Sequence, residues 1–472
     1  MSGDARKPGA SPARSEAQPS EVQQDRHPRD RLRRELSLHD AVFLVVASVV
    51  GSGIFLTPGA IASLLPHPGL ILAVWVVGGL LSLAGALANA ELGAAFPHAG
   101  GDYVYLREAF HPLAGFLAGW LSFFGIFAGT VATLAVGFAQ ALEPLLGIAG
   151  GASTALAIGA VLACSWLNAI GVRHGARANN VTGWIKVGVL AFFVVAAPLS
   201  GRGDVANLRP FVTELFSVAS PLAFALALSP VLFSYLGWNA TVFVASEIRD
   251  PGRNVPRSLF VGLGLCIALY LALNLAYLYA APVARLAGAP NAGELAAEVI
   301  VGPRGGGFVA AFVLISILGT LSATILVGPR IAYAMALDQI FLRMADRVHA
   351  EYATPTGAIW LQAAVACALV GLLETFPSAL DFTTFGIVLA TMADTLALFA
   401  LRRRQPGRPR PYRAWGYPWL PLVYLAANAA IAVGLLVGRP REAGIALAVL
   451  GVGVPAYFGF QLWRKEGDGP SR

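Results

Sequence analysis

Charged residues are scarce in this sequence, and their scarcity excludes an ordinary soluble protein. Only 12% of the 472 residues are Asp, Glu, Lys or Arg, whereas 57% are hydrophobic. An average soluble domain contains about 25% charged residues and about 45–50% apolar ones. The mean hydropathy of +0.67 is correspondingly high. These proportions indicate an integral membrane protein.

Cysteine and clustered histidine are also lacking. The three cysteines, Cys164, Cys266 and Cys367, each fall inside an apolar stretch, where an isolated cysteine usually acts as a small hydrophobic residue. The seven histidines show no metal-ligand spacing, and no nucleophile stands next to a base in a recognisable arrangement. We therefore predict no disulfide framework, no metal site, no cofactor and no enzyme activity.

Long apolar runs are what the sequence does contain. Twelve stretches are long enough to cross about 30 Å of hydrocarbon. They lie near residues 39–65, 69–95, 112–142, 152–171, 181–199, 221–246, 258–281, 307–336, 357–375, 380–400, 416–436 and 442–462. The sequence therefore predicts an all-α integral membrane protein with twelve transmembrane helices.

The net charge of +7 is explained better by membrane topology than by nucleic acid binding, because the basic residues gather on one side of the predicted membrane. If the N-terminus is inside, the inner connections hold Arg26 to Arg34, Arg173, Arg177, Arg249, Arg253, Arg257, Arg402, Arg403, Arg404, Arg408, Arg410, Arg413, Arg464 and Lys465. The outer ones hold only Arg202, Arg209, Arg285, Arg304, Arg439 and Arg441. This asymmetry is the positive-inside pattern. It predicts a multi-pass protein of the cell (inner) membrane with both termini cytoplasmic and no nucleic acid partner.

The first 35 residues differ from the rest of the chain. They are rich in Ser, Pro, Arg, Asp and Gln and contain no apolar core, so they do not form a secretory signal peptide. We predict a disordered cytoplasmic tail over residues 1–35. A second cytoplasmic tail is predicted over residues 464–472.

Two of the predicted spans contain a weak point. The first carries Gly51, Ser52 and Gly53 in succession, and the sixth carries Gly237 within FSYLGWNATVF. Each glycine costs about 1 kcal/mol relative to alanine inside a helix. An unwound backbone at membrane depth must also line a cavity or be covered by protein. Small residues at such points are often close-packing devices, and that remains the alternative explanation.

The two weak points lie five spans apart, which is typical of transporters built as inverted repeats. We predict a first repeat over residues 36–200, a second over 221–401, and two extra helices over 415–463. Amides in the unwound first helix suit a carboxylate, and carbonyls in the unwound sixth suit an ammonium group. A zwitterionic α-amino acid satisfies both.

Several longer motifs resemble one transporter superfamily. They are VVGSGIFLTPGAIA, AVWVVGG, ANAELGAAFPHAGGDYVYLREAFHPLAGFLAGW, FSYLGWNATVFVASEIRDPGRNVPRSL, RIAYAMALDQIF, TPTGAIW and RPYRAWGYPWLP. From about residue 36 to 462 the chain resembles the amino acid/polyamine/organocation (APC) superfamily, and within it the L-type amino acid transporters and their bacterial relatives.

The resemblance implies a LeuT-like fold of five plus five inverted helices, with helices 1 and 6 unwound. It places the substrate carboxylate near Val50, Gly51, Ser52, Gly53 and Ile54. It gives the ammonium group the carbonyls of Phe233, Ser234 and Leu236, with Phe233 also as a gate and Asn239 as a polar support. The chain departs from the family pattern at Leu236, where glycine or a small polar residue is common, so the shape of the side-chain pocket is open.

Lys186 is the only lysine within a predicted span. An ionisable residue at membrane depth is a functional candidate by default, although lysine can also extend along the helix to the interface. The resemblance implies that its ammonium group takes the place of a sodium ion against the carbonyls near Gly51. Sodium dependence is therefore not expected, and Lys186 is the predicted coupling residue.

The predicted absence of acidic residues from the middle of the spans favours neutral substrates, because a pocket for cationic amino acids would usually contain a carboxylate. Glu91, Glu143 and Glu247 fall towards the ends of spans, and the sequence predicts no carboxylate at mid-depth. Glu247 and Arg253 either latch the inner gate through ion pairs or belong to an ordinary solvated loop. Tyr103 and Tyr105 are predicted to be interfacial anchors.

The predicted function is sodium-independent exchange or proton-assisted uptake of neutral L-amino acids by alternating access. A carrier of cationic amino acids or polyamines is the alternative, and a transporter-like sensor is a third, weaker possibility. The loop EPLLGIAGG lacks the cysteine through which eukaryotic relatives bond to a heavy chain. The resemblance therefore implies no disulfide-linked partner, and the protein is expected to act as a monomer or a loose homo-oligomer.

Overall fold

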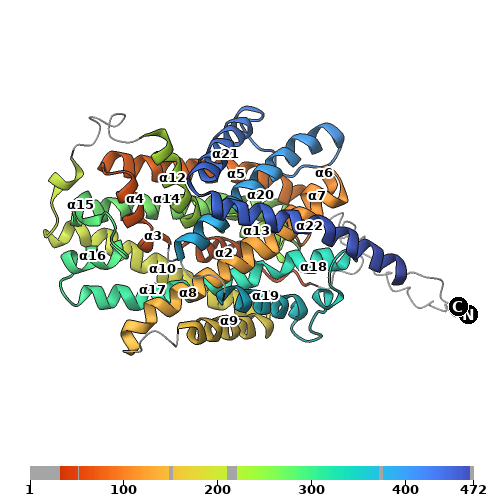
Figure 1. Ribbon diagram of the computed structural model, residues 1–472, viewed down its shortest axis with the longest axis horizontal. Helices are drawn as coiled ribbons and strands as arrows, with labels where there is room; N and C mark the ends of the chain where they lie inside the picture. The colour runs from red at the N-terminus through yellow and green to blue at the C-terminus, as the bar shows by residue number, and fades with distance from the viewer. Residues whose placement is uncertain (1–31, 52, 148–152, 210–219, 372–375, 468–472) are drawn as a thin grey trace, which may run out of the picture. The chain divides into compact units, whose positions relative to one another are not determined.

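The computed structural model describes residues 32–51, 53–147, 153–209, 220–371 and 376–467, which form helices joined by short connections (Figure 1). The first half contains α2 (Leu38–Val49), α3 (Gly53–Leu56), α4 (Pro58–Leu64), α5 (Pro68–Ala95), α6 (Asp102–Ala109), α7 (Pro112–Trp120), a π-helical stretch (Leu121–Phe127), α8 (Ala128–Leu146), α9 (Ser153–Ala169), α10 (Val172–Ser200) and a 3-10 turn (Val205–Leu208).

The second half begins at residue 220. It contains α12 (Pro221–Ser234), α13 (Ala240–Phe243), a 3-10 turn (Ala245–Glu247), α14 (Pro251–Ala280), α15 (Val283–Leu286), α16 (Ala292–Ile300), α17 (Gly305–Val327), α18 (Pro329–Leu337), a 3-10 turn (Arg343–Asp346), α19 (Thr356–Val370), α20 (Phe376–Arg404), α21 (Trp419–Gly438) and α22 (Pro440–Gly467).

Apolar helices occupy all twelve of the predicted spans. Nine helical stretches among the described residues are long and apolar enough to cross a membrane. The shorter apolar helices α9, α12 and α19 fall in the fourth, sixth and ninth predicted spans. The all-helical class is thus confirmed for the described residues, while the ordering of these helices into two inverted sets of five stays a prediction.

Both predicted breaks are present. Helix α2 ends at Val49 and α3 begins at Gly53, and Val50 between them has the non-helical angles φ −74° and ψ 88°. Helix α12 ends at Ser234, and α13 begins only at Ala240. Gly237 lies between α12 and α13 with φ +97°, a conformation that residues with a Cβ rarely adopt.

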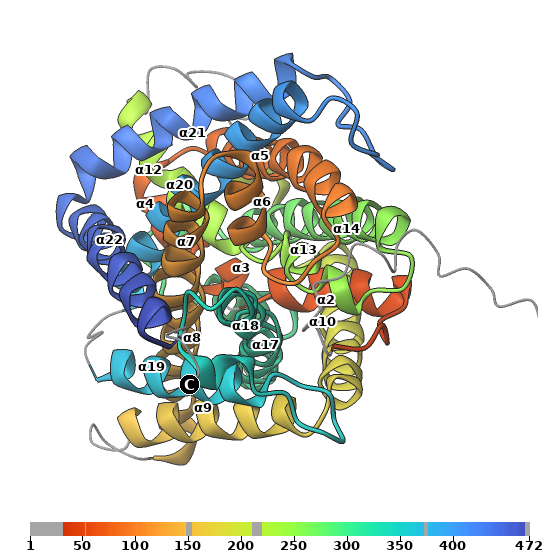
Figure 2. The same cartoon turned by 90° about the vertical axis from the view of Figure 1, so that its right-hand side faces the viewer.

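The broken helices lie inside the bundle. In the views of Figures 1 and 2, α3 and α13 are surrounded by longer helices, while α21 and α9 lie on opposite sides. Helix α14 packs against α5 and α2, and α17 packs against α8 and α10. The short segments that carry the breaks are therefore covered by protein, as an interrupted backbone at membrane depth requires.

The chain before α2 is tied to the chain that follows α13. Leu36 donates its backbone N–H to the Glu247 carbonyl at 2.9 Å and accepts one from Arg249 at 2.9 Å, which makes a parallel bridge between Leu36 and Ile248. Helix α2 then starts with a capping box in which Ser37 and Asp40 bond reciprocally. The beginning of the first broken helix and the end of the sixth are thus held together.

Candidate functional site

One cavity lies where the two breaks meet. It holds about 810 Å³, counting the part that is open to solvent. Its walls come from the two breaks and from α6, the π-helical stretch, α8, α17 and α20. The lining residues are Ser48, Val49, Gly51, Gly53, Asp102, Ile126, Phe127, Thr130, Leu134, Phe233, Ser234, Leu236, Gly237, Trp238, Asn239, Ala240, Phe243, Thr320, Thr324, Val327, Ile387, Ala390 and Thr391.

Most of the predicted substrate-binding residues border this cavity. They are Gly51, Gly53, Phe233, Ser234, Leu236 and Asn239. Val50 and Ile54 are fully buried and are not among the lining residues. Ser52 lies outside the described residues. Six residues chosen from two distant parts of the chain therefore share one cavity, although their role in binding stays a prediction.

The glycines at the breaks also permit close contact between the two helices. A Cβ on Gly53 would lie 2.9 Å from the Cα of Ser234 and 2.6 Å from its Oγ. A Cβ on Gly237 would lie 3.0 Å from the carbonyl oxygen of Ser48. Close packing is therefore a genuine function of these glycines, in addition to their place at the cavity wall.

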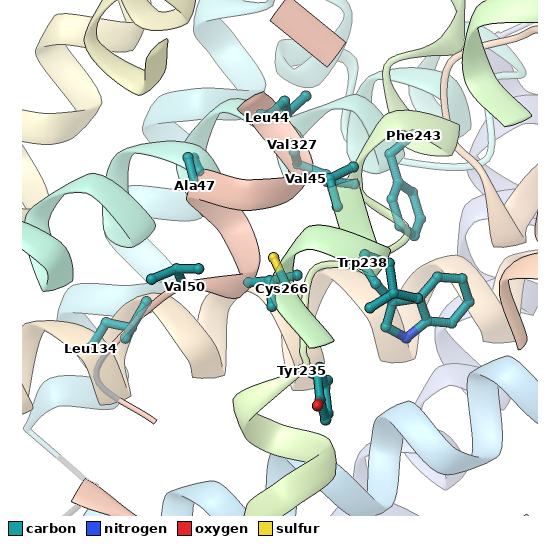
Figure 3. Close-up of a cluster of buried hydrophobic side chains, with 14 of the residues drawn as sticks. Leu44, Val45, Ala47, Val50, Leu134, Tyr235, Trp238, Phe243, Cys266 and Val327 are labelled. Carbon is teal, nitrogen blue, oxygen red and sulfur yellow. The ribbon is translucent and has the colours of Figure 1, made fainter. Parts of the chain in front are cut away.

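Figure 3 shows this junction from the side of the buried apolar cluster. Ala47 and Val50 lie on the first broken helix, next to the segment of the sixth that carries Tyr235 and Trp238. Cys266 of α14 lies between them. The apolar side chains thus enclose the two breaks and keep bulk water away from their backbone groups.

Hydroxyl groups from neighbouring helices satisfy the freed carbonyls of the first break. The Tyr270 hydroxyl of α14 lies 2.8 Å from the Val49 carbonyl oxygen and 3.0 Å from that of Ser234. Ser316 and Thr320 of α17 donate to the Val50 carbonyl at 3.3 and 3.1 Å. Tyr270 thus contacts both breaks at once, and no sequence motif singled it out.

Lys186 of α10 reaches the end of α2. Its Nζ donates to the Ala47 carbonyl at 2.9 Å and to Thr320 Oγ1 at 2.9 Å. The residue is fully buried, so the alternative of a side chain that extends to the membrane interface is wrong. A single ammonium group thereby joins α10, α2 and α17 beside the cavity.

The rest of the wall is apolar, with a few hydroxyl groups. Ile126, Phe127, Leu134, Val327 and Ile387 provide the apolar surface, and Thr130, Thr324 and Thr391 provide the hydroxyls. No basic side chain is among the lining residues, and Asp102 is the one acidic residue there. Such a wall suits an uncharged side chain of small or medium size.

The expectation that mid-depth positions hold no carboxylate is wrong. Asp394 lies inside α20 with no exposed surface, and Asp102 at the start of α6 is 3% exposed and borders the cavity. Tyr103 and Tyr105 of α6 have no exposed surface either, so they are not interfacial anchors. The sequence did not reveal that the segment after α5 folds back into the bundle and brings its polar residues with it.

Glu247 forms a buried ion pair, and its partner is a residue that the sequence did not single out. Arg330 of α18 donates from Nε to Glu247 Oε1 at 2.7 Å and from an Nη to Oε2 at 3.1 Å, and both side chains are 1% exposed. Arg253 is exposed and forms no ion pair among the described residues. The latch interpretation therefore applies to Glu247 and α18, not to Arg253.

The chain was compared with known proteins. Residues 36–454 match the family model for "Amino acid permease". The chain is 30% identical over 434 residues to the serine/threonine exchanger SteT of Bacillus subtilis, covering 91% of this chain and 97% of that protein. It is 28% identical to human large neutral amino acids transporter small subunit 2 and 27% to mouse Asc-type amino acid transporter 1, in each case covering 92% of this chain and 82% of the relative.

Proposed function

The chain belongs to the amino acid permease family, and from this premise we propose that it carries neutral L-amino acids across the cytoplasmic membrane by alternating access. The observation that carries the proposal is that two interrupted helices meet at one cavity whose other walls are mostly apolar, with a few hydroxyl groups. The backbone of the breaks supplies polar groups for the constant part of an amino acid. The apolar walls receive the variable side chain.

We assign the substrate carboxylate to the amides between Gly51 and Gly53, at the start of α3. The ammonium group then faces the carbonyls at the end of α12, near Phe233 and Ser234. This orientation places the substrate side chain towards the threonines and aliphatic residues of α8 and α20. Small aliphatic and hydroxyl-bearing amino acids fit that surface, as the name of the serine/threonine exchanger suggests for that relative.

A cationic substrate is less well supported. Glu143 and Glu247 are not among the lining residues, and Glu247 is already paired with Arg330. Asp102 does border the cavity, but its Oδ2 accepts a hydrogen bond from Ser122 at 3.0 Å. A carboxyl group held in this way is poorly placed to serve as the counterion of a lysine or arginine side chain.

The test is exchange by purified protein in liposomes. Vesicles loaded with unlabelled serine, alanine or leucine should accumulate the same labelled amino acid, and lysine-loaded or putrescine-loaded vesicles should not accumulate theirs. Protein-free vesicles are the control. Accumulation of lysine or putrescine without accumulation of any neutral amino acid would contradict the proposal.

We expect no dependence on sodium. The Lys186 ammonium group already donates to the Ala47 carbonyl, where a bound cation would otherwise be required. Replacing sodium by choline on both sides of the liposome membrane should leave the initial uptake rate of labelled serine unchanged. A rate that rises steeply with sodium concentration would show that the role given to Lys186 is wrong.

The orientation of the protein in the membrane and its subunit partners are part of the same proposal. We infer that both termini face the cytoplasm, because the arginine-rich connections fall on one side of the predicted topology. We also infer that the chain acts without a disulfide-linked heavy chain, as a monomer or a loose homo-oligomer.

A further inference from the structure

Two carboxyl groups lie together beside the cavity, away from the backbone groups assigned to the substrate. Asp102 begins α6 and Asp394 lies in α20, two helices that pack against each other, and the two buried carboxyl groups interact electrostatically. Ser122 donates to Oδ2 of Asp102 at 3.0 Å, and the amide of Asn89 of α5 interacts with Asp394. Oδ1 of Asp102 and both oxygens of Asp394 receive no hydrogen bond from the described residues.

The surroundings of the pair provide no positive charge. Asp102 is 3% exposed, and Asp394 and Asn89 have no exposed surface. The titratable groups that interact with the pair are the hydroxyls of Tyr105 on α6 and Tyr424 on α21. No arginine, lysine or histidine in the described part of the chain contributes to the electrostatics of either carboxyl group.

Two adjacent carboxylates cannot both stay ionised in such a place. Each buried charge carries a desolvation cost, and the two like charges repel each other, so a close pair of this kind shares one proton. Burial raises the pKa of Asp102 above that of a free aspartate. The arrangement in this structure is therefore that of a pair holding a single proton.

Polar groups connect the pair with the cavity. Asp102 itself is a lining residue, and so is Thr391, which precedes Asp394 by three positions on α20 and lies on the same helix face. The Tyr424 hydroxyl interacts with Thr391. The amide of Asn89 and the hydroxyl of Tyr105, both fully buried, have no hydrogen-bond partner among the described residues. Buried polar groups without a partner are costly. These two are tolerable if the carboxyl pair and the polar residues around it rearrange during transport.

We propose that Asp102 and Asp394 form a proton-binding site whose single proton moves across the membrane together with the amino acid. The inference rests on the proposed function, since it names the ion that accompanies the substrate. The proton binds while α6 and α20 are packed together, as in this structure. It leaves when these elements separate, because water then reaches both carboxylates and removes the cost of ionising them.

The sign of the pH effect follows from the shared proton. The protonated pair is compatible with the packed arrangement of α6 and α20, whereas the doubly ionised pair is not. Uptake should therefore be highest at acidic external pH. Above the apparent pKa of the pair, the fraction of protein that holds the proton, and with it the uptake rate, should fall about tenfold for each pH unit.

The experiment measures proton and amino acid movement in the same liposomes. A pH-sensitive dye trapped inside reports proton entry when serine is added outside, and labelled serine reports uptake. The wild type should acidify the lumen on serine addition. Asp394→Asn, whose amide has the shape of the protonated acid, should take up serine by exchange without acidification, and its uptake should no longer depend on external pH.

Asp381→Asn is the matched control on the same helix. Asp381 accepts a hydrogen bond from Ser229 and pairs with Arg439, and it does not line the cavity. This variant should keep both the acidification and the pH dependence. The proposal is overturned if the wild type takes up serine without proton entry, if Asp394→Asn keeps the wild-type pH profile, or if serine drives entry of labelled sodium instead.

A second readout does not depend on transport. Infrared difference spectra of the purified protein between acidic and alkaline pH should show the C=O stretch of a buried protonated carboxyl group in the wild type and in Asp381→Asn, and its loss in Asp394→Asn. If no neutral amino acid is transported but this band titrates, the proposed function fails and the proton site stands. If exchange is normal and the band is absent at every pH, the proton site alone is wrong.

Discussion

Replacing Lys186 by alanine should slow amino acid exchange in liposomes by about one to two orders of magnitude while substrate affinity changes little. The change removes the donor to the Ala47 carbonyl and to Thr320 Oγ1. Each buried group that loses its partner costs about 1–3 kcal/mol. Thr320 Oγ1 also lies 3.1 Å from the Ala47 carbonyl, but its single proton reaches that oxygen only by leaving the Val50 carbonyl, so one acceptor loses its donor in either case.

The loss of these hydrogen bonds should destabilise the conformations in which α10, α2 and α17 are in contact. The balance between outward-open and inward-open states then shifts, and turnover suffers more than binding. Scintillation proximity gives the affinity and liposome exchange gives the rate. Arg177→Ala removes an exposed cation from the same helix and should leave both unchanged. Wild-type exchange in Lys186→Ala would mean that this ammonium group only fills space.

The sequence was sufficient to place the helices and both breaks, because these depend on local composition. Apolar runs of membrane length mark helices wherever they occur. Glycine at mid-span marks weak points because no other residue lowers helix stability so much without ending the helix. Gly51, Gly53 and Gly237 identified the correct segments, and the cavity lies between those segments.

The groups that support the breaks could not be predicted in the same way. Tyr270, Ser316 and Thr320 lie on helices α14 and α17, more than 200 residues from the carbonyls of α2 that they contact. Hydroxyl residues are common in membrane helices and usually bond to their own backbone. Nothing in their spacing shows which of them faces a broken helix, because that depends on how the helices pack.

Charged residues were the least predictable. Asp394 lies eight positions before the arginine run that ends α20, and its sequence neighbours do not show that it is buried. Glu247 is close in sequence to Arg253, but the guanidinium group that reaches it comes from Arg330, 83 positions later. A buried charge takes its partner from the tertiary structure, and proximity in sequence is a poor guide to that partner.

Glu247→Gln should open the end of the protein at which the two broken helices are tied together. The change leaves the Arg330 guanidinium group buried without a counterion, held only by the Leu326 carbonyl and the new amide. Removing one partner of a buried ion pair costs about 3–5 kcal/mol. That cost applies only while the pair is enclosed, so it favours opening at this end, which the proposed topology places on the cytoplasmic side, by about two to four orders of magnitude.

Thiol labelling from the cytoplasmic side measures this shift. In a background where the three native cysteines are replaced by alanine, Ala240→Cys puts a thiol on the cavity wall. A membrane-impermeant maleimide should modify it much faster when Glu247→Gln is present. Arg253→Gln, six positions later in the first turn of α14 but exposed, should not change the labelling rate, and equal rates in all three proteins would refute the latch.

A double variant separates the attraction within the pair from the penalty of an orphaned charge. Glu247→Leu combined with Arg330→Met removes both charges and fills their volume with apolar atoms, which is often neutral or stabilising for a buried pair. Its melting temperature should return to that of the wild type or exceed it, and its cavity thiol should again be protected. If the double variant labels as fast as Glu247→Gln, the ion pair itself holds this end closed, and apolar side chains at positions 247 and 330 are insufficient to replace it.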